Sequence, residues 1–196
     1  MKVIVFVRHG KSQANAKIML THDLGVHPLT EEGIEQVRST TEMIAKIPKV
    51  DAIYTSPVLR ALQTAEIIGK RISVKLKVDA RLSERAMGGL NNTKYSTIEE
   101  LHTRFKKEIE SGYATGVESF DTMAHRMKAF ADSVRGGVAI AVSHSDPIMG
   151  ILGTLDPQYG DHDFVTRIPY ASMTAIDFEN KKIMCVGSAS LPGSLL

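Results

Sequence analysis

The stretch Val3-Ile4-Val5-Phe6-Val7-Arg8-His9-Gly10, near the start of the chain, decides the fold. Its five consecutive apolar residues are mostly β-branched, which predicts a strand buried on both faces. A second such run, Val138-Ala139-Ile140-Ala141-Val142, ends in Ser143-His144. Fully apolar strands of this kind are typical of a parallel sheet that helices cover on both sides.

Shorter patterns fill the rest of the chain. Further strands are expected at 50–54 and 74–78, with a C-terminal hairpin from 173–178 and 182–186. Helical spacing of apolar residues predicts helices at 30–47, 57–68, 97–110 and 119–134. Ser56 is expected to cap the helix that starts at Pro57. The chain is therefore predicted to be one domain over 1–196, a three-layer α/β/α sandwich with a mostly parallel sheet and a small helical lid inserted at about 85–125.

The composition excludes several classes of protein. Of the 196 residues, 43% are hydrophobic and 23% charged, as in an ordinary globular domain. The net charge of +2 is too small to favour nucleic acid or an anionic membrane as the main partner. The single cysteine, Cys185, excludes an internal disulfide and a multi-cysteine metal site, and its apolar neighbours indicate an inert thiol. The apolar run 3–7 is short for a signal peptide, so a cytoplasmic protein is expected.

Polar residues follow the strands at the end where an open α/β sheet binds its ligands. Arg8-His9-Gly10 follows the first strand, and Ser143-His144-Ser145 follows the run that ends at 142. Arg60 lies one turn into the helix after the 50–54 strand. If these ends adjoin, two imidazoles and two guanidiniums share one pocket with the free N–H groups of helix starts. Such a pocket predicts an anion site, because a guanidinium fork matches two phosphate oxygens.

A histidine at the centre of an anion site indicates phosphoryl transfer. A neutral imidazole attacks phosphorus and forms a phosphohistidine, so His9 is the candidate nucleophile. Arg8, Arg60 and His144 would hold the phosphoryl oxygens, and their positive field would lower the pKa of His9. Glu84, beyond the third strand, is the candidate general acid for the leaving alkoxide. This scheme requires neither a metal nor an organic cofactor.

At these residues the chain resembles the histidine phosphatase superfamily, the phosphoglycerate mutase-like proteins. The similarity runs in order over residues 2–178, through Arg8-His9-Gly10, Ser12, Asn15, Gly33, Gln36, Ser56-Pro57, Arg60, Gln63, Thr64, Glu84-Arg85, Gly88, Gly116, Glu118, Ser119, Arg126 and Ser143-His144. The resemblance implies that His9 is the phosphorylated histidine, with Arg8, Asn15 and Arg60 in its phosphate pocket. It also implies that Glu84 is the acid–base residue and that His144 is the second histidine of the site.

Three features of the sequence bear on the reaction. Where the family usually has glycine after the second histidine, this chain has Ser145, which we expect to present its N–H to phosphate. The insertion after Glu84 is short for a mutase and has no adjacent arginine pair for a substrate carboxylate, Arg104 and Lys106-Lys107 being the nearest substitutes. The residues directly after Glu84, in contrast, resemble those of the mutases.

Hydrolysis of a small phosphomonoester is the predicted function. A phosphoglycerate mutase primed by 2,3-bisphosphoglycerate is the alternative within the same chemistry, and a catalytically idle phosphate-binding module is the alternative of another class. The expected partner is a small phosphorylated metabolite, without nucleic acid or membrane. The sequence leaves open whether the chain forms a homo-oligomer.

Two loops contain metal-ligand residue types, and one glycine adjoins the candidate nucleophile, but none of them is predicted to bind a ligand. His22-Asp23 with His27, and Asp161-His162-Asp163, contain metal-ligand residue types but are predicted to be solvated loops without a metal. Gly10 is expected for its backbone freedom rather than for a close contact.

Overall fold

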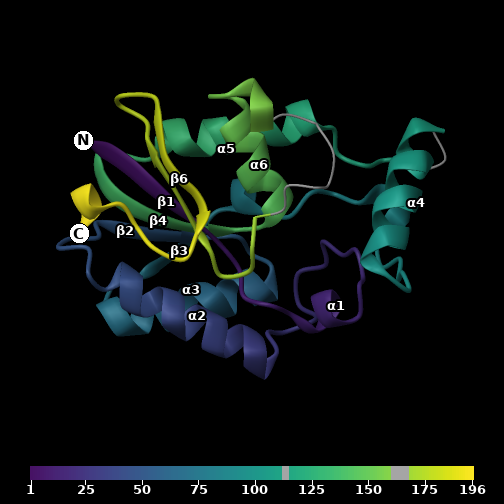
Figure 1. The fold of residues 1–196 in the computed structure, drawn as a ribbon, viewed down its shortest axis with the longest axis horizontal. Helices are drawn as coiled ribbons and strands as arrows, with labels where there is room; N and C mark the ends of the chain where they lie inside the picture. Colours follow the sequence, from purple (N-terminus) through teal and green to yellow (C-terminus); the bar gives the residue numbers. More distant parts are fainter. Residues whose placement is uncertain (112–114, 160–167) are drawn as a thin grey trace.

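A central mixed sheet organises the chain, whose computed structural model describes residues 1–111, 115–159 and 168–196 (Figure 1). The sheet has the strand order β3-β2-β4-β1-β5-β6. The strands are β1 (Lys2–Arg8), β2 (Ala52–Thr55), β3 (Leu76–Val78), β4 (Gly137–Ser143), β5 (Met173–Asp177) and β6 (Lys182–Ser188). Neighbours from β3 to β1 are parallel, whereas β5 and β6 are antiparallel. The predicted mostly parallel sheet with a C-terminal hairpin is confirmed.

Helices cover both faces of the sheet, which confirms the three-layer sandwich. On one face lie α2 (Glu31–Ile44) and α3 (Leu59–Ile72), and on the other lie α5 (Phe120–Ser133) and α6 (Ser145–Gly153) (Figure 1). Two helices, α1 (Gln13–Ala16) and α4 (Ile98–Glu110), lie beyond the carboxyl ends of the parallel strands. They stand at the end of the sheet where ligands are expected.

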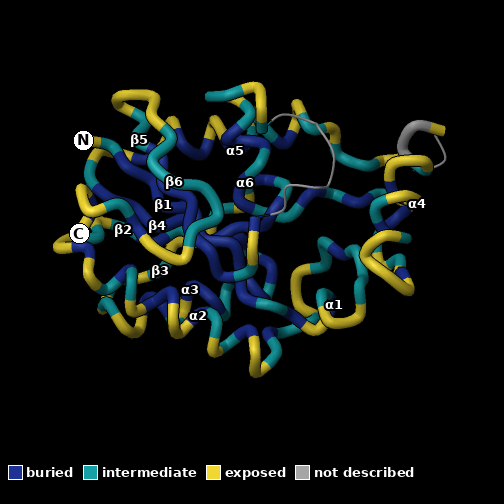
Figure 2. Tube along the Cα trace, viewed as in Figure 1, coloured by how far each residue is buried: buried dark blue, intermediate teal, exposed yellow. Residues whose placement is uncertain are grey.

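The alternation of side chains along β1 divides the interior into two cores. Figure 2 shows β1 and β4 in dark blue, as buried strands. Odd-numbered residues from Val3 to Val7 face α2 and α3, while Ile4 and Phe6 face α5 and α6. The first core contains Val37, Ile44, Ala61, Ala65 and Ile68, together with Leu191 and Leu195 of the C-terminal segment. The second contains Met127, Phe130, Ile148 and Ile151. Because both faces of β1 are buried, its sequence is continuously apolar.

The start of α3 differs from the prediction. The helix begins at Leu59 with Val58 as its N-cap residue, so Pro57 is not its first residue and Ser56 is not its cap. The Ser56 hydroxyl accepts a hydrogen bond from the Val58 N–H at 3.2 Å and lies beside His144 instead. The start of α2 follows expectation, since the Thr30 hydroxyl accepts from the Gly33 N–H at 3.0 Å.

Gly10 is required for a close approach, not for backbone freedom. Its φ lies outside the left-handed region. A Cβ atom on Gly10 would lie 2.4 Å from the Gly33 carbonyl oxygen, and one on Gly33 would lie 2.1 Å from the Lys11 carbonyl oxygen. The loop after β1 therefore packs directly on the first turn of α2, and the expectation for Gly10 was wrong.

The segment between β3 and α5 packs partly on its own small core. The buried side chains of Met87, Leu90 and Phe105 form this cluster, and Leu20 and Val117 pack against it. In contrast, α5 packs against α6 in the helical layer. Among residues 1–111, 115–159 and 168–196, no helix combines the length and the apolar character needed to cross a membrane.

Candidate active site

The register of β1 and β4 places His9 beside His144. Arg8 pairs with Ser143 at the ends of these parallel strands, and the His9 N–H donates to the Ser143 carbonyl at 3.1 Å. The two imidazole ring centres are 5.0 Å apart. Both residues are buried, with 1% and 0% of their surfaces exposed. The structure thus brings together two histidines that are 135 positions apart in the sequence.

The hydrogen bonds of His9 leave one of its ring nitrogens with a lone pair. Its Nδ1 lies 2.7 Å from the Gly10 carbonyl, which can only accept, so Nδ1 carries the proton. Its Nε2 accepts from Arg60 Nε at 3.1 Å. Burial, followed by the charges of Arg60 and Arg8, holds the pKa of His9 well below its usual value. His9 is therefore a neutral imidazole with Nε2 as its basic atom.

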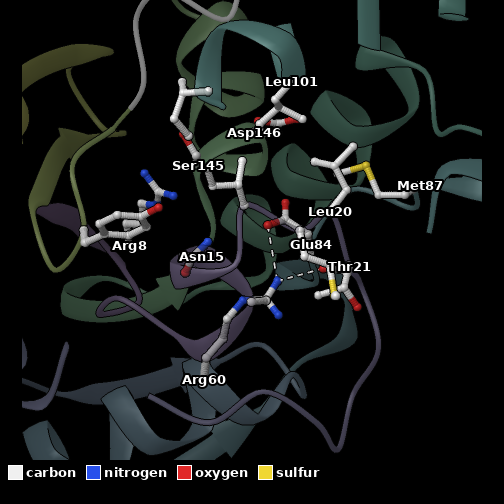
Figure 3. A pocket seen from close by; sticks show the side chains of 15 residues that line it. Arg8, Asn15, Leu20, Thr21, Arg60, Glu84, Met87, Leu101, Ser145 and Asp146 are labelled. Atoms are coloured by element: carbon white, nitrogen blue, oxygen red, sulfur yellow. Dashed lines mark hydrogen bonds and ion pairs between the residues drawn. The ribbon is translucent and has the colours of Figure 1, made fainter. Parts of the chain in front are cut away.

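Arg60 extends from the first turn of α3 and contacts several parts of the site (Figure 3). Its Nη2 donates to the Thr21 carbonyl at 3.0 Å and lies 3.4 Å from a carboxylate oxygen of Glu84. Its Nη1 is buried and has no hydrogen-bond partner within the described part of the chain. A buried charged donor without a partner is costly, so this atom is a ready ligand for an anion.

Arg8 enters the same pocket from the end of β1. Its Nη1 donates to the Ile168 carbonyl, and its guanidinium lies over the Tyr170 ring, 3.9 Å from the ring centre. Tyr170 was missed by the sequence reasoning, and no local pattern could have revealed it because the stacking partner is far away in the sequence. The ring of Tyr170 is also 6.2 Å from that of His9.

Asn15 presents an amide donor to the pocket. The backbone N–H and the hydroxyl of Ser12 donate to Asn15 Oδ1 at 3.0 and 2.8 Å, which fixes the orientation of the amide. The Asn15 side chain lines the pocket with its nitrogen directed inward (Figure 3). This arrangement suits an oxygen acceptor such as phosphate.

His144 precedes α6 and is held by Ser56. Its Nε2 lies 2.9 Å from the Ser56 hydroxyl, and its Nδ1 lies 3.4 Å from Glu84 Oε2 without the alignment of a hydrogen bond. Burial, then Arg60 and His9, holds the pKa of His144 well below its usual value. Ser56 was expected as a helix cap, and its contact with the second histidine was missed.

Glu84 lines the pocket, and its environment raises the pKa of its carboxyl group. Burial raises its pKa first and the charge of Asp146 next, against the opposing influence of Arg60. Its Oε1 accepts from the Arg85 N–H at 2.9 Å. A carboxyl group that retains its proton is suited to general-acid chemistry.

Two residues that the resemblance singled out brace the segment that carries Glu84. Arg126 Nε and Nη2 donate to the two carboxylate oxygens of Glu118 at 2.7 and 2.9 Å, a bidentate pair. Arg126 also donates to the backbone carbonyls of Arg81 and Glu84 at 2.6 and 3.3 Å. The Glu118 carbonyl accepts from Arg85 Nε at 2.8 Å. These bonds hold Glu84 at a fixed position relative to α5.

Ser145 and Asp146 open α6 beside the two histidines. Ser145 lines the pocket, and as the first helical residue it has an N–H without an intrahelical acceptor. Its hydroxyl accepts from the Ile168 N–H at 3.3 Å. Of the residues predicted for the site, Arg8, Asn15, Arg60, Glu84 and Ser145 line one pocket, while His9 contacts Arg60 and His144 lies beside Glu84.

A comparison with known families agrees with this geometry. The model of the histidine phosphatase superfamily (branch 1) matches residues 4–189 of the chain. The chain belongs to this superfamily. Its members are phosphatases and phosphotransferases, so the chain is an enzyme of this class.

Individual members of the superfamily carry different activities in their names. A 2,3-bisphosphoglycerate-dependent phosphoglycerate mutase from Thermoplasma acidophilum is 29% identical, over 100% of this chain and 96% of its own length. A phosphoglycerate mutase structure from Bacillus anthracis superimposes with a TM-score of 0.79 at 20% identity, over 96% of this chain and 93% of the other. A putative α-ribazole-5′-phosphate phosphatase from Escherichia coli also gives 0.79, at 19% identity over 98% and 100%. The two solved structures share the fold of this superfamily member.

The cationic residues of α4 do not line the pocket. Arg104 forms ion pairs with Glu100 and Glu108 of its own helix at 3.0 and 3.1 Å, and Lys106 and Lys107 are exposed. None of the three is among the described residues of the pocket wall. Arg104 is therefore paired within its own helix, and Lys106 and Lys107 lie outside the described pocket wall, so none of them replaces a carboxylate-binding arginine pair there.

The loop with His22 and Asp23, which contains metal-ligand residue types, forms hydrogen bonds to the segment after Glu84. The Asp23 carboxylate accepts from the amides of Asn91 and Asn92 at 2.7 and 2.8 Å. His22 Nδ1 accepts from the Met87 N–H at 3.1 Å. These bonds tie the loop to the segment after Glu84. The other candidate loop, 161–163, lies outside the described residues.

Proposed function

We propose that the chain hydrolyses a small phosphomonoester through a phosphohistidine on His9. The observation that carries this proposal is the neutral imidazole of His9, whose Nε2 accepts from Arg60, a residue that lines the pocket together with Arg8. An anion-binding site with an uncharged nucleophile at its base suits phosphoryl transfer better than binding alone.

In the first step the Nε2 atom attacks phosphorus while the bond from phosphorus to the ester oxygen breaks. The proton of the Glu84 carboxyl passes to the leaving oxygen, which departs as an alcohol. The phosphoryl oxygens are held by Arg8, Arg60 Nη1, the Asn15 amide and the Ser145 N–H. His144, with Nδ1 beside Glu84, completes the set of residues around the transferred group.

In the second step water attacks the phosphorus of phosphohistidine. The Glu84 carboxylate takes one proton from this water, the nitrogen–phosphorus bond breaks, and inorganic phosphate is released. Glu84 is then protonated and His9 neutral, as at the start. The cycle consumes one phosphomonoester and one water and yields an alcohol and phosphate.

The proposed cycle uses no metal ion. One nitrogen or oxygen atom from each of His9, Glu84 and His144 lies within 4.8 Å of the others, a spacing that a metal could bridge. However, the adjacent guanidiniums of Arg8 and Arg60 repel a dication. We therefore expect activity to survive EDTA and to be inhibited by vanadate.

The second candidate function is a mutase primed by 2,3-bisphosphoglycerate, which the name of the 29% identical relative favours. In that case phosphohistidine returns its phosphoryl group to a phosphoglycerate hydroxyl instead of to water. The occupied arginine of α4 favours hydrolysis, because no second cationic site for a carboxylate is evident in the described pocket wall.

A single pair of assays separates these functions. The enzyme is incubated with 3-phosphoglycerate, with and without 2,3-bisphosphoglycerate, and with a panel of alkyl and aryl phosphates. Hydrolysis predicts inorganic phosphate, whereas a mutase predicts 2-phosphoglycerate that depends on the bisphosphate. Rapid quenching with ³²P-labelled substrate should give an acid-labile label on His9. A label elsewhere, or none during turnover, would overturn the proposed mechanism.

A further inference from the structure

The pocket has two chemically different ends (Figure 3). We call Arg8, Asn15 and Arg60 of the lining, together with His9, which contacts Arg60, and the adjacent His144, the phosphoryl end. On the opposite side from Arg8, Leu20, Met87 and Leu101 face the cavity. We call the whole apolar side of the lining the apolar wall; it consists of Ile18, Met19, Leu20, Met87, Ile98 and Leu101.

Outside the phosphoryl end, the described pocket lining has no basic side chain. Within the described lining, Arg8 and Arg60 are the basic side chains, and both belong to the phosphoryl end. The acidic side chains are Glu84 and Asp146. Asp146 lies 3.7 Å from Arg85 Nη1, which only partly offsets its charge at this distance. A carboxylate on the substrate would meet an acid and hydrocarbon instead of a cation, and burying it there would be costly.

The apolar wall is held in place by backbone pairing. The Leu20 N–H donates to the Thr93 carbonyl at 3.0 Å, and the Asn92 N–H donates to the Leu20 carbonyl at 2.7 Å. The Tyr95 N–H donates to the Ile18 carbonyl at 3.0 Å. The segments 18–20 and 92–95 therefore form a small two-stranded contact. A preformed surface of this kind binds its ligand without a large ordering cost.

Ile18 adopts a conformation that β-branched residues rarely occupy. Its φ is +50°, in the left-handed region, where a β-branched side chain is strained. The Ile18 N–H donates to the Asn15 carbonyl at 3.1 Å, so the strained residue follows directly from the turn that positions the phosphate ligand Asn15. Strain retained at a pocket wall indicates that the surface there serves a ligand.

We propose that the apolar wall binds the alcohol portion of the substrate and selects uncharged, predominantly hydrocarbon alcohols over carboxylated ones. This inference rests on the proposed function and narrows its substrate class. The phosphoryl group occupies the phosphoryl end, and the ester carbon chain lies against Met87, Leu101 and Ile98. Each buried methylene adds about 0.8 kcal/mol, or roughly a fourfold gain in kcat/KM.

The test compares two esters with chains of the same length. Pentyl phosphate ends in a hydrocarbon, whereas 4-phosphonooxybutanoate ends in a carboxylate. Their leaving alcohols have similar acidity, so the chemical step is matched. We expect kcat/KM to be about 100-fold higher for pentyl phosphate. Equal values, or a preference for the carboxylated ester, would overturn the inference while leaving the hydrolytic function intact.

A positive charge placed on the apolar wall should change the ratio of kcat/KM for pentyl phosphate to kcat/KM for 4-phosphonooxybutanoate. Ile98 is 45% exposed, so Ile98→Lys should fold, and its ammonium can approach a substrate carboxylate. We expect the preference for pentyl phosphate to fall about tenfold. Val78, exposed on the edge strand β3 and outside the pocket lining, provides the control, and Val78→Lys should leave the ratio unchanged. An unchanged ratio in Ile98→Lys would contradict the assignment of the apolar wall.

A binding assay separates the inference from the proposed mechanism. Pentylphosphonate and 4-phosphonobutanoate, which cannot be hydrolysed, are titrated into the enzyme by calorimetry. Tighter binding of pentylphosphonate supports the apolar wall even if no phosphohistidine is found. Equal or weaker binding rejects it even if His9 is phosphorylated. Absence of a label on His9 during turnover rejects the mechanism alone.

Discussion

The two ends of the pocket are built on different parts of the fold. His9 and His144 follow adjacent strands, whose register fixes them within 5.0 Å of each other. The apolar wall lies on the loop after α1, on the segment after Glu84 and on α4, outside the sheet. In the function proposed above, the edge of the sheet carries the nucleophile and the connecting segments carry the selectivity. Changes at the phosphoryl end should affect all substrates alike, whereas changes at the apolar wall should affect substrates differently.

The largest expected effect is that of His9→Ala. Without the nucleophile, kcat should fall at least about 10⁴-fold on every phosphomonoester, because no phosphohistidine can form. Initial rates on an aryl and an alkyl phosphate measure this loss. His125→Ala, on the exposed face of α5, is the matched control and should retain full activity. If the fall in kcat differed between the aryl and the alkyl phosphate, the phosphoryl end would also contribute to substrate selectivity, contrary to the comparison with the apolar wall.

Glu84→Gln should separate substrates by their leaving groups. The amide keeps the shape of the carboxyl but supplies no acidic proton, so kcat/KM for pentyl phosphate should fall about 10²–10³-fold. For p-nitrophenyl phosphate, whose leaving group needs no proton, kcat/KM should change less than about tenfold. The exposed residue Glu66 on α3 offers a control in Glu66→Gln. If kcat/KM fell equally for both esters, Glu84 would not be the general acid.

The buried histidines should make folding stability depend on pH. The pKa values of His9 and His144 lie well below 6.5 in the folded chain, so only the unfolded chain takes up protons as pH falls from about 6.5 to 5. Stability should therefore be full above pH 6.5 and decline below it. Glu84 acts in the opposite direction, since its raised pKa stabilises the folded state toward lower pH.

Because two histidines act against one carboxyl, the free energy of unfolding should fall, with a net slope, as the pH falls from about 6.5 to 5. Urea unfolding at several pH values between 5 and 6.5 measures this slope. The double variant His9→Asn, His144→Asn should lose it or reverse its sign. A slope that persists in the variant would show that other groups dominate.

Ser56→Ala should have the smallest effect. The hydroxyl lies 2.9 Å from His144 Nε2, and its removal costs the ring one hydrogen-bond partner, worth about 1 kcal/mol. We expect kcat to fall about 3–10-fold on all substrates with little change in KM. Steady-state kinetics on the aryl and alkyl esters test this expectation. If the fall in kcat differed between the aryl and alkyl esters, Ser56 would contribute to substrate selectivity instead.

The sheet and most of its catalytic edge could be predicted from the sequence. The apolar runs of β1 and β4 are continuous because both faces of these strands are buried, and a histidine directly follows each strand. The positions of Arg8 and Arg60 follow from the same argument. These signals are local, so a single sequence contains them.

The remaining features depend on contacts between distant segments. Ser56 has the sequence context of a helix cap, but its hydroxyl lies beside His144, 88 positions away. Gly10 has a close neighbour in Gly33, and Tyr170 stacks on Arg8. The apolar wall combines residues from several segments, among them Ile18 and Leu101. No local pattern specifies such pairs, since tertiary packing creates them.

Arg60 links the nucleophile to the loop that bears part of the apolar wall. One guanidinium donates both to His9 Nε2 and to the carbonyl of Thr21, the residue after Leu20. An ill-fitting alcohol that displaces this loop must therefore tilt the same group that aligns phosphorus for attack. A poor fit at the apolar wall should therefore lower kcat in addition to weakening binding, because the contact made by Thr21 and the contact made by His9 share one guanidinium.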